Sequence, residues 1–393
     1  MKLFLSIVFA VVLTASGVVC QNTSSPLPNE PAARPFNMLV LGDSVLWGEG
    51  LKTEHKSWYH VKTWIEKNTG RTVIERIEAH AGAVIEEAAV DEKLTATDGE
   101  VNVALPTVSD EVDRALRHYG DGSQVDLVLV TGCVNDIGGQ NLLNASTSDE
   151  IVHLTEAKCG APMQSLLQKI TSSFPNADVI VTGYYLFFSE KTRNDFVLRA
   201  LARKFLRINP AAAKLTDKES FNRLIGNSQV WHQSSNKTLG AVVEKANAEL
   251  KGRGSQKQVM FTNIQFAPEY SFGSKGTRLW GFDRSPFRMI LVLLSFGKIL
   301  LPSNDEVRGR RRTSCNEVFI RQPKESPTQK EERQYRRLLC RYAALGHPNR
   351  QGALLYSDAI TSLLKSIPGF SSSSPSLLQN KRYVLLIDYR RQN

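Results

Sequence analysis

The chain has 393 residues, of which 41% are hydrophobic and 22% are charged. This is an ordinary globular composition, so it excludes a chain that is disordered throughout. The formal net charge is +10, but residues 308–341 hold eleven Lys or Arg and four Glu, so the basic character is local. We interpret this segment as a solvated basic face. The alternative is a surface for nucleic acid or another anionic polymer, built on the arginines at positions 308, 310, 311 and 312.

Residues 1–20 have the pattern of a secretory signal peptide. Lys2 supplies the positive charge, Leu3–Leu13 forms the apolar run, and small residues follow as a cleavage region. A membrane anchor is disfavoured because a spanning helix needs about 20 apolar residues. We therefore predict a secreted, extracellular protein whose mature chain begins near Gln21, with residues 21–36 as a linker into the domain.

From Asn37 onward, short β-rich apolar runs alternate with longer amphipathic stretches. We predict strands at Met38–Leu41, Val73–Ile77, Val125–Val130, Val179–Thr182 and Val259–Ile264. We predict helices near residues 54–68, 108–118, 161–173, 194–206, 238–251, 328–345 and 352–366. This alternation indicates an α/β architecture with a parallel sheet, in one domain over residues 37–368.

Two segments interrupt this pattern. Residues 284–303 contain an apolar stretch, Met289–Phe296, that is too short to span a membrane. We interpret the segment as a buried helix or an insertion at the rim of the domain, or else as translated intron from an error in the gene model. The tail at residues 369–393 begins with a serine-rich run and is predicted to lie outside the core.

Export favours disulfides over metal or redox roles for cysteine. Four cysteines remain after removal of the signal peptide, and proximity suggests that Cys133 pairs with Cys159 and Cys315 with Cys340. Four cysteines allow three pairings, so the alternatives stay open. Three sequons also fit a secreted glycoprotein, and they begin at Asn22, Asn144 and Asn236.

The strongest motif is Gly42-Asp43-Ser44, which directly follows the strand predicted at Met38–Leu41. Ligands of open α/β sheets bind at the carboxyl ends of the strands. A serine in that position can project its hydroxyl into the crevice, and glycine at position 42 allows the tight turn. Ser44 is therefore a candidate nucleophile.

Three further motifs follow at the ends of later elements. Gly82 comes after the second strand, Asn135 after the third, and His347 stands before a proline and the last helix. In this order the four blocks resemble the SGNH (GDSL-type) hydrolase family, over roughly residues 37–280 and 305–367. The Gly-x-Ser-x-Gly elbow of the α/β-hydrolase fold is absent from the sequence.

The resemblance implies a three-layer α/β/α sandwich with a mostly parallel, five-stranded, flavodoxin-like sheet. It implies a serine esterase in which Ser44 is the nucleophile and His347 the general base, a role that suits an imidazole with a pKa near 6.5. The oxyanion donors are then the backbone N–H groups of Ser44 and Gly82 and the side-chain amide of Asn135. Supporting roles fall to the neighbouring acidic residues, Asp43 and Asp136.

Two features depart from the family pattern. Ala344 stands three residues before His347, where an aspartate usually orients the imidazole. A backbone carbonyl, or an acid from elsewhere such as Asp358, must then hold the ring, and a dyad of weaker activity is expected. The nearest glycine lies three residues before Asn135 rather than two, so either the loop carries one extra residue or Cys133 fills the glycine position.

No metal site is predicted, because the remaining histidines are scattered and the cysteines lack zinc-like spacing. The resemblance implies no organic cofactor either. Trp47 and Trp58 are interpreted as core residues, or else as walls of an acyl or sugar pocket.

The predicted activity is hydrolysis of a carboxylic ester through an acyl-serine, with a preference for acetylated carbohydrate that rests on family analogy. One alternative is a lipase or lysophospholipase that acts on lipid or small esters. Another is a catalytically silent carbohydrate-binding protein, which Ala344 favours. The expected partner is a small-molecule, polysaccharide or lipid ester, without nucleic acid, without stable membrane insertion, and with a monomeric chain.

Overall fold

The computed structural model describes residues 34–87, 98–144, 147–195, 198, 218–294, 301–321 and 323–370. The predicted signal peptide, most of the predicted linker, the tail beyond residue 370, most of the helix predicted at 194–206 and the sequon at Asn22 lie outside these ranges. Within them, no helix combines the length and the hydropathy that crossing a bilayer requires.

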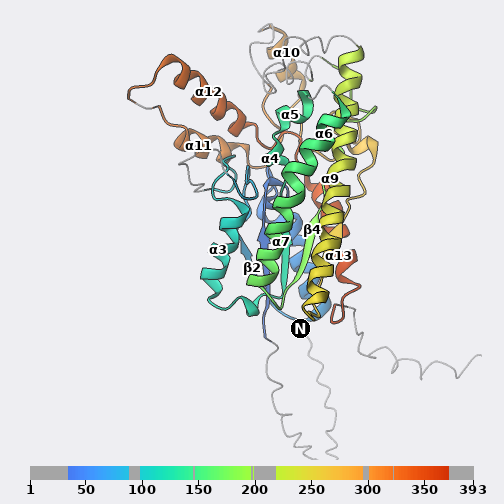
Figure 1. Cartoon of the computed structure of the whole chain (residues 1–393). Coiled ribbons are helices and arrows are strands. Elements are labelled where there is room, and N and C mark those ends of the chain that lie inside the picture. The colour runs from blue at the N-terminus through green and yellow to red at the C-terminus, as the bar shows by residue number, and fades with distance from the viewer. Residues whose placement is uncertain are drawn as a thin grey trace, which may run out of the picture. The chain divides into compact units, whose positions relative to one another are not determined.

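Five strands form the centre of the fold (Figure 1). They are β1 Phe36–Leu41, β2 Val73–Ile77, β3 Leu127–Val130, β4 Asp178–Thr182 and β5 Val259–Thr262. Their order is β2-β1-β3-β4-β5, and every neighbouring pair is parallel. This is the strand order of a flavodoxin-like sheet. The predicted fold class is confirmed, and the strand ends differ from the prediction by at most two residues.

The helices of the described residues alternate with these strands. They are α1 Ser44–Trp47, α2 Ser57–Thr69, α3 Val108–Tyr119, α4 Val134–Ile137, α5 Gly139–Asn144, α6 Ser148–Thr155, α7 Ala161–Ser173, α9 Lys218–Gly252, α10 Pro286–Leu294, α11 Arg308–Val318, α12 Pro327–Arg341 and α13 Arg350–Leu364. Short 3₁₀ turns lie at Thr53–His55, Gly122–Gln124 and Pro268–Tyr270, and a π-helical turn lies at Glu156–Gly160.

The two faces of the sheet pack into separate cores, because successive side chains of a strand point to opposite faces. Leu39 and Leu41 of β1 face the core that α3, α7 and α9 cover, whereas Met38 and Val40 face the core under α2 and α13. The same alternation runs along β3 and β4. The molecule therefore has three layers, with helices on both faces of the sheet.

Helix α9 is much longer than predicted. It begins at Lys218 rather than near residue 238. The added segment is rich in Asn, Ser and His, which are weak helix formers. Its buried Leu224 and Trp231 belong to the core that α9 covers. Packing therefore overrides the weak local propensity.

The segment at residues 284–303 leaves and rejoins the domain at one point. Phe282 forms a β-bridge with Ser303 at its base, and α10 lies between them. The interpretation as a buried helix is wrong for the first turns of α10, because Phe287 is 72% and Ile290 is 53% exposed. The two ends of the segment lie together, and its origin as an insertion stays a prediction.

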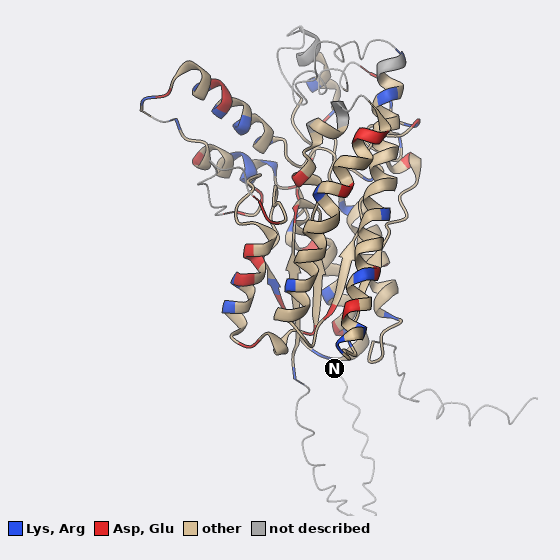
Figure 2. Cartoon of the chain, viewed as in Figure 1, with Lys and Arg blue, Asp and Glu red and all other residues tan. Residues whose placement is uncertain are grey.

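Helices α11 and α12 form a hairpin to one side of the sheet (Figure 1), which we call the arm, residues 308–341. The disulfide between Cys315 and Cys340 joins its two helices. Acidic and basic residues are mixed along it (Figure 2). Its second helix ends at Arg341, so the predicted helix at 328–345 is four residues too long at that end.

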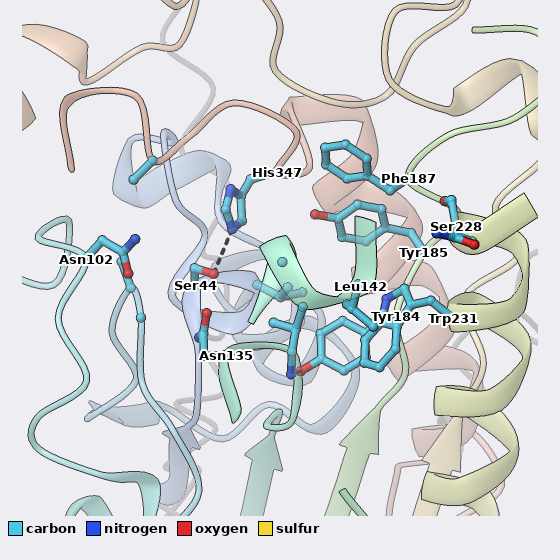
Figure 3. Close-up of a pocket in the computed structure, with 17 residues that line it drawn as sticks. Ser44, Asn102, Asn135, Leu142, Tyr184, Tyr185, Phe187, Ser228, Trp231 and His347 are labelled. Carbon is cyan, nitrogen blue, oxygen red and sulfur yellow. Dashed lines mark hydrogen bonds between the residues drawn. The ribbon is translucent and has the colours of Figure 1, made fainter. Parts of the chain in front are cut away.

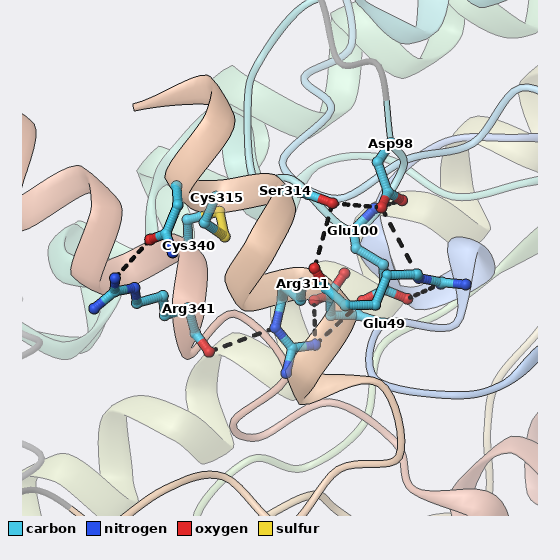
Figure 4. Close-up of a disulfide and its surroundings, with 10 residues drawn as sticks. Glu49, Asp98, Glu100, Arg311, Ser314, Cys315, Cys340 and Arg341 are labelled. Carbon is cyan, nitrogen blue, oxygen red and sulfur yellow. Dashed lines mark hydrogen bonds and ion pairs between the residues drawn. A yellow bond between two sulfur atoms is a disulfide. The ribbon is translucent and has the colours of Figure 1, made fainter. Parts of the chain in front are cut away.

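The interpretation of the arginine cluster as a solvated basic face is wrong for Arg311. Its side chain is 0% exposed and forms ion pairs with Glu49, Glu100 and Asp305 (Figure 4). The neighbouring Arg310 pairs with Glu100 as well. Part of the cluster is therefore neutralised inside the fold and is no surface for an anionic polymer.

The side chain of Asn236, in the third predicted sequon, is used for contacts inside the fold. The side chain is buried, its oxygen accepts from the backbone N–H of Tyr184, and its nitrogen donates to the carbonyls of Tyr184 and His232. A glycan cannot be attached to a side chain in this position. The side chain of Asn144 lies outside the described residues.

Candidate active site

Ser44 stands where β1 ends at the carboxyl edge of the sheet. Gly42 makes the turn with φ +115°, and a Cβ there would lie 2.1 Å from the carbonyl oxygen of Thr131. The carboxylate of Asp43 then caps α1 by accepting from the N–H of Val45 at 2.9 Å. Since only glycine fits the turn, the sequence places the serine at the start of a short helix.

Asp43 joins three strand ends beneath the serine. Its buried carboxylate accepts hydrogen bonds from the hydroxyls of Thr131, at 3.0 Å, and Tyr184, at 2.6 Å. The Tyr184 oxygen in turn accepts from the N–H of Val134 at 3.2 Å. Burial raises the pKa of Asp43, and these hydrogen bonds act against the rise. Asp43 lies behind Ser44, outside the lining of the cavity beside it.

The structure brings His347 to Ser44 across 303 positions of sequence. Nε2 of His347 lies 2.7 Å from Oγ of Ser44 (Figure 3). The loop that carries the histidine is held on two sides. Trp280 exchanges backbone hydrogen bonds with His347 and Gly346, and the hydroxyl of Tyr185 donates to the carbonyl of Gly346 at 2.8 Å.

The imidazole of His347 is neutral at ordinary pH. Burial lowers its pKa to about 4, and the positive charge of Arg311 acts in the same direction. The backbone carbonyls of Ala343 and Ala344 act in the opposite direction. A buried, neutral imidazole in contact with a hydroxyl can accept its proton.

Of the two kinds of partner predicted for the far side of the His347 ring, the carboxylate of Asp358 is not found there, whereas backbone carbonyls lie close to the imidazole. Nδ1 makes no hydrogen bond to any described residue, although the carbonyls of Ala343 and Ala344 lie near enough to affect the pKa. Asp358 is exposed on α13, where its charge acts on His60 instead. Ala344 itself packs in an apolar cluster with Leu51, Trp280 and Ala353, which leaves no polar environment for a carboxylate.

The three predicted oxyanion donors line one cavity with Ser44 and His347. The backbone N–H groups of Ser44 and Gly82 have no hydrogen-bond partner among the described residues. Gly82 has φ +83°, and a Cβ there would lie 2.2 Å from Oδ1 of Asn102. The amide of Asn135 donates one hydrogen to the carbonyl of Ala83 at 2.9 Å and retains a second, because an amide nitrogen carries two.

Cys133 fills the place of the missing glycine. It is a non-glycine residue with positive φ, +138°, and lies two residues before Asn135. Such a conformation costs of the order of 1–3 kcal/mol and persists only where the surroundings impose it. Here a disulfide to Cys159 anchors the residue, so both pairings suggested by sequence proximity are present in the structure.

Asp136 ties the segment after Gly82 to α4. Its Oδ1 accepts from the N–H of Ile85 at 2.8 Å, while Oδ2 is buried and has no partner among the described residues. Burial raises the pKa of Asp136 to about 7. The residue supports the Asn135 loop and does not line the cavity beside Ser44.

A buried pair that the sequence analysis missed connects two of these segments. Nδ1 of His80 lies 2.9 Å from Glu111, whose other oxygen accepts from the N–H of Gly42 at 2.6 Å. Burial lowers the pKa of His80 to about 4 and raises that of Glu111 well above its ordinary value. The signal was present, because Glu111 lies on the apolar face of α3 between Val108 and Ala115.

The cavity beside Ser44 and His347 has a volume of about 250 Å³ and is lined mainly by aromatic and aliphatic side chains (Figure 3). Sequence patterns did not identify these walls. Trp47 and Trp58 do not line it. Trp58 packs in the core under α2, as interpreted, and Trp47 lies beneath the ammonium group of Lys56.

Comparisons with known proteins identify similar structures only. No family model and no curated protein matches the chain. One similar solved structure is phospholipase A1 from Streptomyces albidoflavus NA297, with 13% identity, a TM-score of 0.39, and coverage of 64% of this chain and 89% of that one. A second is an extracellular lipase from Streptomyces rimosus, with 16% identity, a TM-score of 0.37, and coverage of 63% and 88%. A third is a Clostridium thermocellum family 3 carbohydrate esterase, with 15% identity, a TM-score of 0.32, and coverage of 62% and 85%. At TM-scores this low, the likeness assigns neither a family nor an activity to the chain.

Proposed function

We propose that the chain is a secreted serine esterase of the SGNH (GDSL-type) hydrolase family, acting through an acyl-Ser44 intermediate. The observation that carries the proposal is the 2.7 Å contact between Ser44 Oγ and His347 Nε2. It lies in a cavity where the N–H groups of Ser44 and Gly82 are unpaired among the described residues. A hydroxyl, a neutral base and free donors at one point are what acyl transfer requires.

The reaction follows from this geometry. Nε2 of His347 takes the hydroxyl proton as Ser44 Oγ attacks the ester carbonyl, and the N–H groups of Ser44 and Gly82 and the amide of Asn135 stabilise the oxyanion. The intermediate collapses when the C–O bond to the alcohol breaks, and the imidazolium returns its proton to the leaving oxygen. Water then attacks the acyl-serine with the same base, which releases the acid and restores Ser44.

The histidine acts as a member of a dyad. Among the described residues no carboxylate bonds to Nδ1, since Ala344 replaces the family's aspartate and Asp358 acts on His60. The nearby carbonyls of Ala343 and Ala344 supply the favourable charge. Turnover is therefore slower than that of a triad enzyme, because a buried imidazolium is poorly compensated.

Secretion is supported by the two disulfides. Such bonds form and persist in oxidising compartments and are rare in the cytosol. Both join segments close in sequence, at separations of 26 and 25 residues.

The test compares Ser44→Ala with the wild-type protein, using p-nitrophenyl acetate and a fluorophosphonate probe. Ser172→Ala, an exposed serine on α7, is the matched control. We expect a loss of at least about 10³-fold in turnover and no labelling for Ser44→Ala, and no change for the control. Turnover that survives the substitution removes Ser44 from the mechanism. A wild type that neither turns over nor is labelled favours a silent carbohydrate-binding protein.

A further inference from the structure

We infer that the substrate is an ester of an apolar acyl chain several carbons longer than acetyl, and that the chain occupies the 250 Å³ cavity with Trp231 at its far end. This inference rests on the proposed function of Ser44, because it states which acyl group the substrate transfers to that serine. It differs from the preference for acetylated carbohydrate that family analogy suggests.

The walls of the cavity are apolar and come from several elements. They include Val45 of α1, Val134 of α4, Leu142 of α5, Trp231 of α9, and Tyr184 and Phe187 from the segment after β4. In Figure 3 these aromatic side chains lie to one side of the Ser44–His347 contact, and Trp231 and Ser228 lie farthest from Ser44. A chain attached to Ser44 therefore runs toward α9.

Three hydroxyl groups in these walls already form hydrogen bonds within the protein, and the side-chain amides of Asn102 and Asn227 also line the cavity. The hydroxyl of Tyr184 donates to Asp43, and that of Tyr185 donates to Gly346. The hydroxyl oxygen of Ser228 accepts from the backbone N–H of Phe188 at 2.8 Å. The two tyrosines therefore present ring carbon rather than hydroxyl groups to a ligand. A sugar, which needs hydrogen-bond partners along its whole surface, is poorly matched to such a surface.

The cavity is also preformed. Asn236 of α9 holds the backbone of Tyr184 through two hydrogen bonds, each 3.0 Å long. The ring of Tyr184 packs against that of Trp231 with centroids 5.4 Å apart. Both aromatic residues are almost fully buried. Binding of a chain thus requires no rearrangement of these walls, which favours affinity.

The volume indicates the length of chain. An apolar cavity of about 150 Å³ is enough to bind benzene. The present cavity of about 250 Å³ is larger, so it accommodates a chain of roughly six to ten carbon atoms. An acetyl group leaves most of the space unfilled and gains little from the walls.

A second hollow on the other side of the oxyanion donors suits the alcohol part of the ester. It has a volume of about 410 Å³ and shares Gly82, Asn102 and Asn135 with the first. Its other walls include the acidic Glu87 and Asp136 and the basic Arg336 of the arm. Figure 3 shows Asn102 on the side of Ser44 away from Trp231. The geometry therefore separates an apolar acyl end from a polar alcohol end.

The first experiment measures kcat/KM for p-nitrophenyl esters from acetate to palmitate. We expect a rise of about fourfold for each added methylene until the cavity is filled, because burying a methylene contributes about 0.8 kcal/mol. Beyond that length kcat/KM falls. The inactivation rates of p-nitrophenyl alkylphosphonates of matching lengths are expected to follow the same order.

The second experiment enlarges the far end of the cavity. Trp231→Ala is expected to move the optimum to longer chains, whereas Trp231→Phe moves it less. Leu142→Ala tests the same wall should the tryptophan variant fail to fold. Trp64→Ala, on the opposite face of the sheet and packed against Phe370, is the control and leaves the optimum in place.

The two proposals fail in different ways. A profile that is flat or highest with acetate, in a protein whose Ser44 is labelled by a small fluorophosphonate, overturns the acyl-chain inference and leaves the esterase intact. An unchanged optimum in both folded cavity variants also overturns it. A protein that no probe labels overturns the proposed function itself.

Discussion

The two halves of the candidate site are held by two different buried polar clusters. Beneath Ser44, a single carboxylate, Asp43, is surrounded by neutral donors at the ends of adjacent strands. Behind His347, the guanidinium of Arg311 faces the carboxylates of Glu49, Glu100 and Asp305. The first cluster is built by the sheet, and the second joins segments that only the folded chain brings together.

The second cluster, Arg311 with Glu49, Glu100 and Asp305, is close to the loop that carries His347. Arg311 lies 2.9 Å from Glu49 and 3.1 Å from Glu100, pairs with Asp305, and reaches the carbonyl of Arg341 at 3.5 Å (Figure 4). Arg310 and Lys56 also interact with Glu100, so Arg311 is not alone in facing these carboxylates. Burial, and then the charge of Glu100, raise the pKa of Glu49 well above its ordinary value.

The difference teaches how each half can fail. The serine half depends on strand ends whose register is set by the core, so losing one hydroxyl there removes one hydrogen bond. The histidine half depends on contacts that span 262 and 211 residues, so losing the Arg311 guanidinium leaves Glu49 and Asp305 buried without an ion-pair partner among the described residues. Five predictions test this contrast.

The largest effect is expected for Arg311→Met. The substitution leaves Glu49 and Asp305 buried without their ion-pair partner and leaves Glu100 with Arg310, which costs about 3–5 kcal/mol in the free energy of unfolding. Chemical denaturation of the purified protein measures this cost. Arg312→Met, an exposed neighbour on α11, is expected to stay within about 0.5 kcal/mol of wild type. Equal stability of the two variants contradicts the assignment of Arg311 as the anchor of the arm.

A smaller effect is expected for Tyr184→Phe in the serine half. The change removes one donor from Asp43 and one acceptor from the N–H of Val134, at a cost of about 1–3 kcal/mol. It also frees the loop of Asn135, so kcat falls more than KM rises. The control is Tyr119→Phe, whose buried hydroxyl has no partner among the described residues and whose loss is nearly neutral. If Tyr184→Phe lowers the free energy of unfolding as much as Arg311→Met does, the proposed difference between the serine half and the histidine half is contradicted.

The pH dependence of kcat/KM probes the proposed base. Because burial lowers the pKa of His347 to about 4, the imidazole stays neutral far below the ordinary value near 6.5. Activity is expected to hold from neutral pH to about pH 5 and to fall as the pH drops through about 4. A fall in kcat/KM that is centred near pH 6.5 contradicts the interpretation of His347 as a buried base with a lowered pKa. Asp136→Asn separates any limb that arises from Asp136, whose pKa is raised to about 7.

Stability has its own pH dependence in the same window. Between about pH 6.5 and 4, unfolded His347 and His80 bind protons that the folded forms do not, so the fold loses stability as the pH falls. Asp136 acts with the opposite sign, because its folded carboxyl keeps a proton up to about pH 7. Denaturation curves at several pH values, with Asp136→Asn as comparison, measure the two contributions.

The smallest effect is expected for Asp358→Asn. This exposed carboxylate on α13 acts on His60 and not on His347, so kcat/KM is expected to be unchanged. The measurement uses the best ester from the chain-length series. A loss of tenfold or more restores Asp358 as the group that orients the proposed base.

Much of the fold follows from local patterns. Apolar runs predicted all five strands, because a buried parallel strand is a continuous hydrophobic segment. The start of α9 was missed because weak helix formers there are held by packing around Trp231. The sequence left open whether the loop before Asn135 carries an extra residue or whether Cys133 takes the place of the family's glycine. Only the positive φ of Cys133 decides for the second alternative.

The sequence by itself determined the order of the strands and helices, because hydrophobic periodicity and turn chemistry are local properties. It also determined that the predicted site residues stand at the ends of these elements, namely Ser44, Gly82, Asn135 and His347. Tertiary structure alone decided which buried polar groups meet. Arg311 reads as a surface charge and Glu111 as a helix residue until chain segments far apart in sequence close around them. The walls of the cavity arise in the same way, because a concave surface exists only where several elements converge.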